Sequence, residues 1–103
     1  MEFTKLPLSE QVLKGVEAAG FSVCTEVQAK VLPVSLTGRD VMVQSKTGSG
    51  KTAIYVLTIL EAMAKARAAG KSDPKALIIA PTRELAVQIE EDTAKLSIAV
   101  KDL

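Results

Sequence analysis

The sequence predicts an α/β fold in which parallel strands are flanked by helices. Two short, continuous apolar runs, Val41-Met42-Val43 and Ala76-Leu77-Ile78-Ile79-Ala80, are typical of strands that are covered on both faces. Stretches with helical periodicity precede, separate and follow these runs. The resulting order α-α-β-α-β-α predicts a right-handed crossover and a parallel layer of strands.

A first helix is expected near the N-terminus. Ser9 is placed to act as its N-cap, and Glu10 follows in the first turn, where the helix dipole favours an anion. Gly20 suits the C-terminal stop. The apolar side chains that share one face of this helix are Val12, Leu13, Val16 and Ala19.

A second helix is expected after the loop 21–24. Thr25 can cap its start, while Pro33 interrupts it or marks its last turn, and Gly38 ends the segment. The apolar positions of this helix are Val27, Val31 and Leu32. Both helices precede the first predicted strand.

Two longer helices follow the two strands. The many alanines and leucines from Lys51 to about Ala69 favour a helix, after which residues 70–74 form a turn cluster. Pro81-Thr82 opens the last helix. Its expected inward side chains are Leu85, Ala86, Ile89 and Leu96.

Length and composition exclude several classes of protein. A chain of 103 residues allows one domain at most, and an apolar content of 48% can form a packed core. The net charge of +1 gives no general electrostatic case for nucleic acid. A single Cys and no His exclude an internal disulfide and the common zinc spacings. No signal peptide or bilayer-length apolar run is found, so a soluble, cytoplasmic protein is expected.

The segment 44–52, QSKTGSGKT, lies between the first strand and the third helix. Gly48 and Gly50 remove side chains, so that backbone N–H groups can wrap an anion at a helix N-terminus. Lys51 places an ammonium where β- and γ-phosphates would lie, and Thr52 offers a hydroxyl to Mg²⁺. This pattern predicts binding of nucleotide phosphates without distinguishing ATP from GTP. The alternative is a Gly/Ser turn followed by a capped helix.

Two further stretches flank this loop. Residues 20–28 read GFSVCTEVQ, and residues 81–86 read PTRELA directly after the second strand. Together with SKTGSGKT, they resemble the Q motif, motif I (the Walker A loop) and motif Ia of DEAD-box ATP-dependent RNA helicases, in that family's order. Ser45 stands where the family usually has Ala, and Cys24 where it usually has Pro. Some bacterial members, including those similar to the degradosome-associated helicase, carry Cys-Thr there.

The resemblance implies a partial RecA-like P-loop domain that uses ATP and Mg²⁺. Gln28 would hydrogen-bond the adenine edge, and Phe3 would stack on the adenine face. Lys51 and Thr52 would serve catalysis, with Thr52 also as the metal ligand. The positions that the resemblance assigns to cofactor binding are Phe3, Phe21, Thr25, Gln28, Ser45, Thr47, Gly48, Ser49, Gly50, Lys51 and Thr52.

Structural alternatives exist for the two adenine contacts. Thr25-x-x-Gln28 is also a helix capping box, which spacing alone favours over a ligand site. The two readings are compatible, because a cap can hold the glutamine in place. For Phe3, the alternative is a core or staple contact with the first helix.

The resemblance assigns Pro81, Thr82 and Arg83 to RNA binding. Pro81 ends the strand and Thr82 can cap the helix, so exposed N–H groups would meet a phosphate of the RNA backbone. Arg83 would add a charge-assisted contact. Such contacts carry no base information, so binding would be independent of RNA sequence. Without the resemblance, an ordinary capped helix with a solvated Arg-Glu pair is the preferred interpretation.

The expected organisation is the N-terminal portion of a first helicase lobe. Residues 1–38 form the Q-motif region, residues 39–103 form the P-loop and motif Ia region, and the sequence ends before an Asp-Glu-Ala-Asp motif. The parent would couple ATP hydrolysis to binding of single-stranded RNA and local duplex unwinding, whereas these residues alone are expected to be inactive. The alternatives are a naturally truncated nucleotide-binding or interaction module, and a different P-loop enzyme such as a small-molecule kinase.

Overall fold

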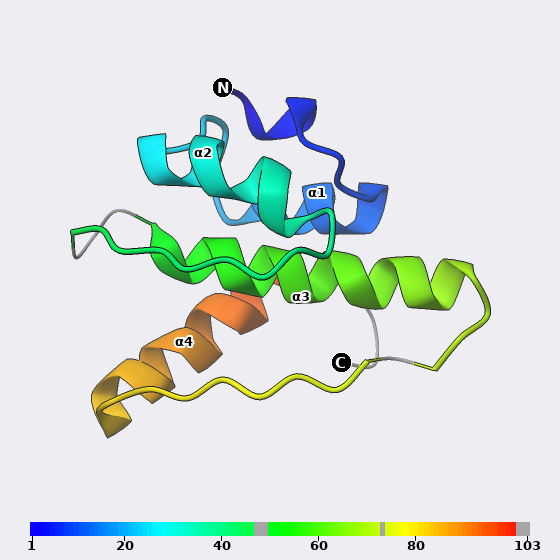
Figure 1. The fold of residues 1–103 in the computed structure, drawn as a ribbon. Helices are drawn as coiled ribbons and strands as arrows, with labels where there is room; N and C mark the ends of the chain where they lie inside the picture. The colour runs from blue at the N-terminus through cyan, green and yellow to red at the C-terminus, as the bar shows by residue number, and fades with distance from the viewer. Residues whose placement is uncertain (47–49, 73, 101–103) are drawn as a thin grey trace.

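The computed structural model describes residues 1–46, 50–72 and 74–100. All four expected helices are present in these ranges, and a short 3-10 helix precedes them (Figure 1). The elements, in chain order, are η1 (Phe3–Lys5), α1 (Glu10–Ala18), α2 (Glu26–Ser35), α3 (Lys51–Ala68) and α4 (Arg83–Leu96).

The helix boundaries follow local sequence signals. Thr25 and Thr82 each accept a hydrogen bond from the backbone N–H three residues later, which caps α2 and α4 as predicted. Pro33 lies in the last turn of α2 and does not end the helix. Ser9 occupies the N-cap position of α1, but its side chain makes no capping bond to its own helix.

Helix α3 forms the centre of the molecule (Figure 1). Helices α1 and α2 pack on one side of α3, and α4 crosses on the other. The C-terminal half of α4 also meets α1, where Gly15 lies directly against the backbone carbonyl of Leu96. The largest fully buried side chains are Phe3, Val12, Val16, Leu32, Val56, Leu57 and Leu60.

The two predicted strands are not observed in the described residues. Segments 41–43 and 76–80 run as open chain without ladder partners, and the described ranges contain only one isolated bridge, between Glu2 and Val23. The expected burial is also wrong, since Met42 is 99% exposed and Leu77 is 84% exposed. A strand requires neighbours on its edges and layers on its faces, and no described segment supplies them. Apolar sequence alone therefore did not produce a sheet.

Helix α4 buries less of its surface than the pattern predicts. Ile89 and Leu96 are buried and Leu85 is half-buried, as expected. Ala86 is exposed, so the prediction that it points inward is wrong. The exposed Ala86 lines a shallow hollow with Ile78 and Ala80 of the open segment, which leaves one flank of α4 uncovered. None of the described helices combines the length and apolar character needed to cross a membrane.

Candidate nucleotide-binding site

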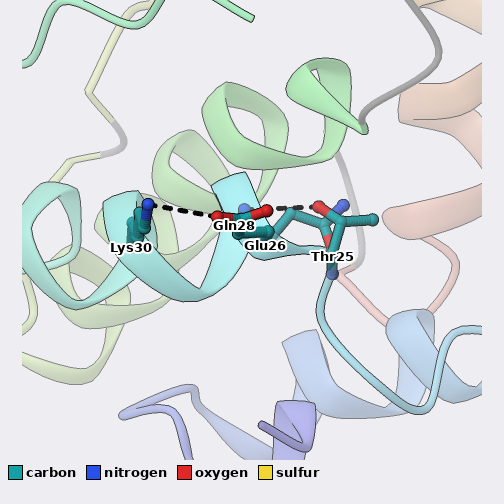
Figure 2. Close-up of polar contacts among 4 residues, drawn as sticks. All are labelled: Thr25, Glu26, Gln28 and Lys30. Carbon is teal, nitrogen blue, oxygen red and sulfur yellow. Dashed lines mark hydrogen bonds and ion pairs between the residues drawn. The ribbon is translucent and has the colours of Figure 1, made fainter. Parts of the chain in front are cut away.

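The start of α2 is a complete capping box (Figure 2). The backbone N–H of Gln28 donates to Thr25 Oγ1 at 3.3 Å, and the backbone N–H of Thr25 donates to Gln28 Oε1 at 2.9 Å. An exposed ion pair lies beside the box, with Lys30 Nζ 3.2 Å from Glu26 Oε1, and adds little stability. The box fixes the rotamer of Gln28, so its amide has a defined direction.

The other end of the Gln28 amide contacts the phosphate loop. Gln28 Nε2 donates to the carbonyl oxygen of Gly50 at 3.1 Å, although the two residues are 22 positions apart. Gly50 has a φ of +86°, the left-handed conformation that favours glycine, and it is the N-cap of α3. A Cβ on Gly50 would fall on the Gln28 amide. The structure therefore joins the Q-motif region to the loop through one buried side chain, which is 3% exposed.

Lys51 and Thr52 form the first turn of α3, as the phosphate-loop interpretation requires. Lys51 Nζ donates to the carbonyl oxygen of Ser45 at 2.6 Å, which draws the two ends of the loop together. Tyr55 donates its hydroxyl proton to Thr52 Oγ1 at 3.3 Å. Both loop side chains are half-buried, so each remains accessible from one side.

Three of the predicted phosphate-contacting residues, Thr47, Gly48 and Ser49, lie outside the described residues. Ser45 is half-buried at the near end of the loop, where its carbonyl accepts the bond from Lys51. The described parts of the loop thus fit an anion cradle on three counts. They supply a left-handed glycine, an ammonium held against the loop, and the N-terminus of an 18-residue helix.

Phe3 occupies a core position and is only 2% exposed. Its ring stacks on Phe21, with centroids 6.0 Å apart and an interplanar angle of 19°. The predicted role of Phe3 as an open stacking surface for adenine does not fit this burial, whereas the alternative of a core contact does. Phe21 is 40% exposed and supplies the accessible aromatic face. Sequence reasoning included Phe21 in the site without assigning it this role.

An open hollow of about 630 Å³ lies beside these groups. Phe21 lines one part of it, and Gly50, Lys51 and Thr52 line another. Helix α4 contributes Leu85 from its first turn and also Gln88. Aromatic, cationic and backbone groups from three separate segments therefore meet at one surface. The hollow has the mixed apolar and polar character of small-ligand sites.

The predicted RNA-contacting residues Pro81, Thr82 and Arg83 are all exposed at the start of α4. Thr82 Oγ1 accepts from the backbone N–H of Leu85 at 3.2 Å, so the helix is capped while its N-terminus faces solvent. This geometry fits both an anion site and the alternative of an ordinary capped helix.

Sequence reasoning missed the buried carboxylate of Glu61. This residue lies in the middle of α3, is 3% exposed and accepts two hydrogen bonds from Ser9. A single acidic residue within an apolar helical run was the available signal, because such a residue on a buried face needs a specific partner.

Comparison with known proteins decides the family. The model of the DEAD/DEAH box helicase family matches residues 25–102, which is most of the chain. This chain belongs to the DEAD/DEAH box helicase family. The resemblance carried by the three motifs is thereby confirmed.

Helicases from distant organisms match nearly the whole chain. This chain is 47% identical over 100 residues to the ATP-dependent RNA helicase RhlB of Pasteurella multocida, and the match covers 96% of this chain. It is 43% identical over 95 residues to the ATP-dependent RNA helicase DBP4 of Debaryomyces hansenii, covering 92% of this chain. The chain spans 24% of the length of that RhlB and 12% of that DBP4.

Solved structures of DEAD-box proteins share the fold. Dbp5 of S. cerevisiae, bound to RNA and ADP BeF3, superposes with a TM-score of 0.85 at 33% identity, over 97% of this chain and 25% of Dbp5. A DEAD box protein from Methanococcus jannaschii gives a TM-score of 0.79 at 32% identity, over 94% of this chain and 26% of that protein. The helices of this DEAD-box chain are therefore arranged as in helicase domains. This similarity confirms the predicted RecA-like fold class, whereas the predicted parallel strands are not observed in the described residues.

Proposed function

We propose that this chain binds ATP with Mg²⁺ and serves an ATP-dependent RNA helicase that couples ATP hydrolysis to RNA binding and duplex unwinding. The observation that carries the proposal is the contact between Gln28 and Gly50, because it places the side chain that we propose to read the base directly against the phosphate loop. A nucleotide that lies across this contact would meet both regions at once.

The phosphates would lie against the loop and the N-terminus of α3. Lys51 would exchange its bond to the Ser45 carbonyl for the β- and γ-phosphates, which are stronger acceptors because they are charged. Thr52 would supply a hydroxyl oxygen to Mg²⁺, and the bound ion would neutralise the phosphate charge. Thr47, Gly48 and Ser49 belong to the same proposed cradle.

Adenine would be held by the Q-motif region. An amide nitrogen carries two hydrogens and an amide oxygen has two lone pairs. Gln28 can therefore keep its bonds to Gly50 and Thr25 and retain one further donor and one further acceptor, which would meet the base once the side chain, now 3% exposed, is uncovered. Because the bonds to Thr25 and Gly50 fix which amide atom donates and which accepts, the pair can match the adenine edge, whereas the guanine edge presents its donor and acceptor in the opposite order. Phe21 would cover the base with its exposed face, supported from behind by Phe3.

RNA would contact the start of α4. Its exposed N-terminus attracts a phosphate, and Arg83 beside it adds a positive charge. Because phosphates are the same in every sequence, this contact would bind RNA without base preference. Residues 1–103 alone would bind ligands without efficient hydrolysis, since they do not contain the Asp-Glu-Ala-Asp motif that would hold Mg²⁺ and position water.

The test of ATP binding is calorimetry on the full chain as its gene encodes it. Lys51→Ala should weaken ATP binding at least about tenfold, because a charge-assisted contact to phosphate is lost. Lys46→Ala is the matched control, since Lys46 is an exposed lysine of the same loop and its loss should change affinity little. Equal ATP affinity in the Lys51 variant and the unmodified protein would contradict the proposal.

The RNA contact has its own test. Arg83→Ala should weaken binding of single-stranded RNA equally for different sequences, and should lower the slope of log affinity against log salt by about 1. Lys14→Ala, an exposed lysine on α1, is the control. An unchanged salt slope in the Arg83 variant would show that α4 does not meet the RNA backbone.

A further inference from the structure

We propose that Glu61 is a positioning residue for nucleotide-base binding, acting through α1 on the aromatic pair Phe3–Phe21. The inference rests on the proposed function, in that it assigns the base contact to Phe21. Its physical basis is a buried carboxylate that connects the helix of the phosphate loop to the N-terminal segment.

Both oxygens of Glu61 bind Ser9, which is 52 positions away in sequence. The backbone N–H of Ser9 donates to Oε1 at 2.7 Å, and Ser9 Oγ donates to Oε2 at 2.7 Å. These short distances are typical of charge-assisted hydrogen bonds. The two ion pairs found among the described residues lie elsewhere, between Lys14 and Glu10 and between Lys30 and Glu26. Ser9 is therefore the principal partner observed for this carboxylate.

The contact explains why the Ser9 hydroxyl does not cap its own helix. Glu61 caps α1 from outside instead, at the end where the helix dipole is positive and stabilises a carboxylate. A buried charge needs such compensation, because burying an uncompensated carboxylate is costly. The result is a fixed point that ties the start of α1 to the middle of α3.

Helix α1 transmits this fixed position to the aromatic pair. Val12 and Val16 are fully buried beneath the helix, so the helix has little freedom to rotate. The backbone N–H of Phe21 donates to the carbonyl oxygen of Val16 at 3.1 Å, and the backbone N–H of Phe3 donates to the carbonyl oxygen of Ser22 at 3.2 Å. The accessible face of Phe21 is thus held by α1, whose start is held by Glu61.

The same α3 helix begins at Lys51, in the phosphate loop. One rigid helix therefore positions both the phosphate-binding residues at its start and, through Glu61 and α1, the Phe21 ring that would contact the base. Removing the Glu61 contact should misplace Phe21 while leaving the loop at the start of α3 unchanged. A variant without the Glu61 contact should consequently lose affinity for the base and keep its affinity for the phosphates.

The experiment compares ATP with inorganic tripolyphosphate, each with Mg²⁺, by calorimetry on the full chain as encoded. Glu61→Ala should weaken ATP binding about tenfold, a loss within the range of base–aromatic stacking, and should leave tripolyphosphate affinity within about twofold. Glu61→Gln should bind ATP about as tightly as the unmodified protein, because its amide can accept from the Ser9 N–H and donate to the Ser9 hydroxyl. Glu10→Ala removes an exposed acid next to Ser9 and is the control for charge.

The possible outcomes separate the two proposals. Equal losses of ATP and tripolyphosphate binding, or no loss of either, would overturn the positioning role while ATP binding by the unmodified protein stands. Absence of ATP binding by the unmodified protein would overturn the proposed function itself. If Glu61→Ala does not fold, Ser9→Ala removes only the hydroxyl contact, and an unchanged ratio of the two affinities would overturn the inference.

Discussion

The amide nitrogen of Gln28 lies 3.1 Å from the carbonyl oxygen of Gly50, the residue immediately before α3. The contact requires glycine on one side and a fixed rotamer on the other. Gly50 is left-handed, and the Gln28 amide fills the space that a Cβ would occupy. The capping box with Thr25 supplies the rotamer. A local helix-capping signal thereby becomes a long-range connection to the phosphate loop.

Gly50→Ala should disrupt this connection. The substitution adds left-handed strain of about 1–2 kcal/mol and also displaces the Gln28 side chain. Gly38→Ala is the matched control, since Gly38 has a φ of +91° and open space around its Cβ position. Chemical denaturation should show a larger loss of stability for Gly50→Ala than for Gly38→Ala, and only the former should weaken ATP binding. Equal losses of stability in both variants would show that backbone strain alone explains the effect and that displacement of Gln28 contributes nothing.

Gly15→Ala should destabilise the packing of α1 on α4. By helix propensity alone, this substitution inside a helix would stabilise the protein by about 1 kcal/mol. At Gly15, the new Cβ would meet the backbone carbonyl of Leu96, which cannot move aside as a side chain can. We therefore expect overpacking to outweigh propensity and the melting temperature to fall. A rise in melting temperature would show that the two helices have room to separate.

Cys24 should react slowly with thiol reagents in the folded protein. Burial raises the pKa of the Cys24 thiol, because desolvation disfavours the charged thiolate. The folded state then holds the proton more tightly than the unfolded state. The thiol's contribution to stability is complete below its unfolded pKa and is lost as the pH rises through the higher folded value.

Two measurements check the Cys24 prediction. Alkylation should accelerate when denaturant is added, and the stability difference between the unmodified protein and Cys24→Ala should shrink as the pH rises above about 8.5. A difference that grows with pH would reverse the sign of the argument. Rapid alkylation of the native protein would show that the thiol is accessible.

The helices could be predicted because their signals are local. Thr25 and Thr82 define helix starts within a few residues, and the structure places both caps as expected. The strands could not be predicted with the same success, because segments 41–43 and 76–80 depend on partners that the described residues do not provide. A strand is a property of several segments, whereas a cap is a property of one.

The candidate site was predictable in its residue types but not in its connections. The motifs identified Gln28 and Lys51, yet spacing alone could not show that Gln28 reaches Gly50. Composition also could not decide which aromatic is accessible, and packing buries Phe3 beneath Phe21. Glu61 was missed because its partner Ser9 is 52 positions away. Such long-range relations depend on how α1 and α3 pack.

The central claim is that Gln28 reads adenine beside the phosphate loop, and Gln28→Glu tests it most directly. Glutamate keeps the acceptor for the Thr25 N–H, and thus the capping box, but loses the donor that faces Gly50 and the base. The decisive measurement is the ratio of GTP to ATP dissociation constants in the full chain as encoded. We expect a ratio of at least about 10 for the unmodified protein and a ratio near 1 for Gln28→Glu, together with a lower thermal stability, because the buried carboxylate would face the Gly50 carbonyl oxygen without a donor between them. Equal affinities of the unmodified protein for ATP and GTP would contradict the claim.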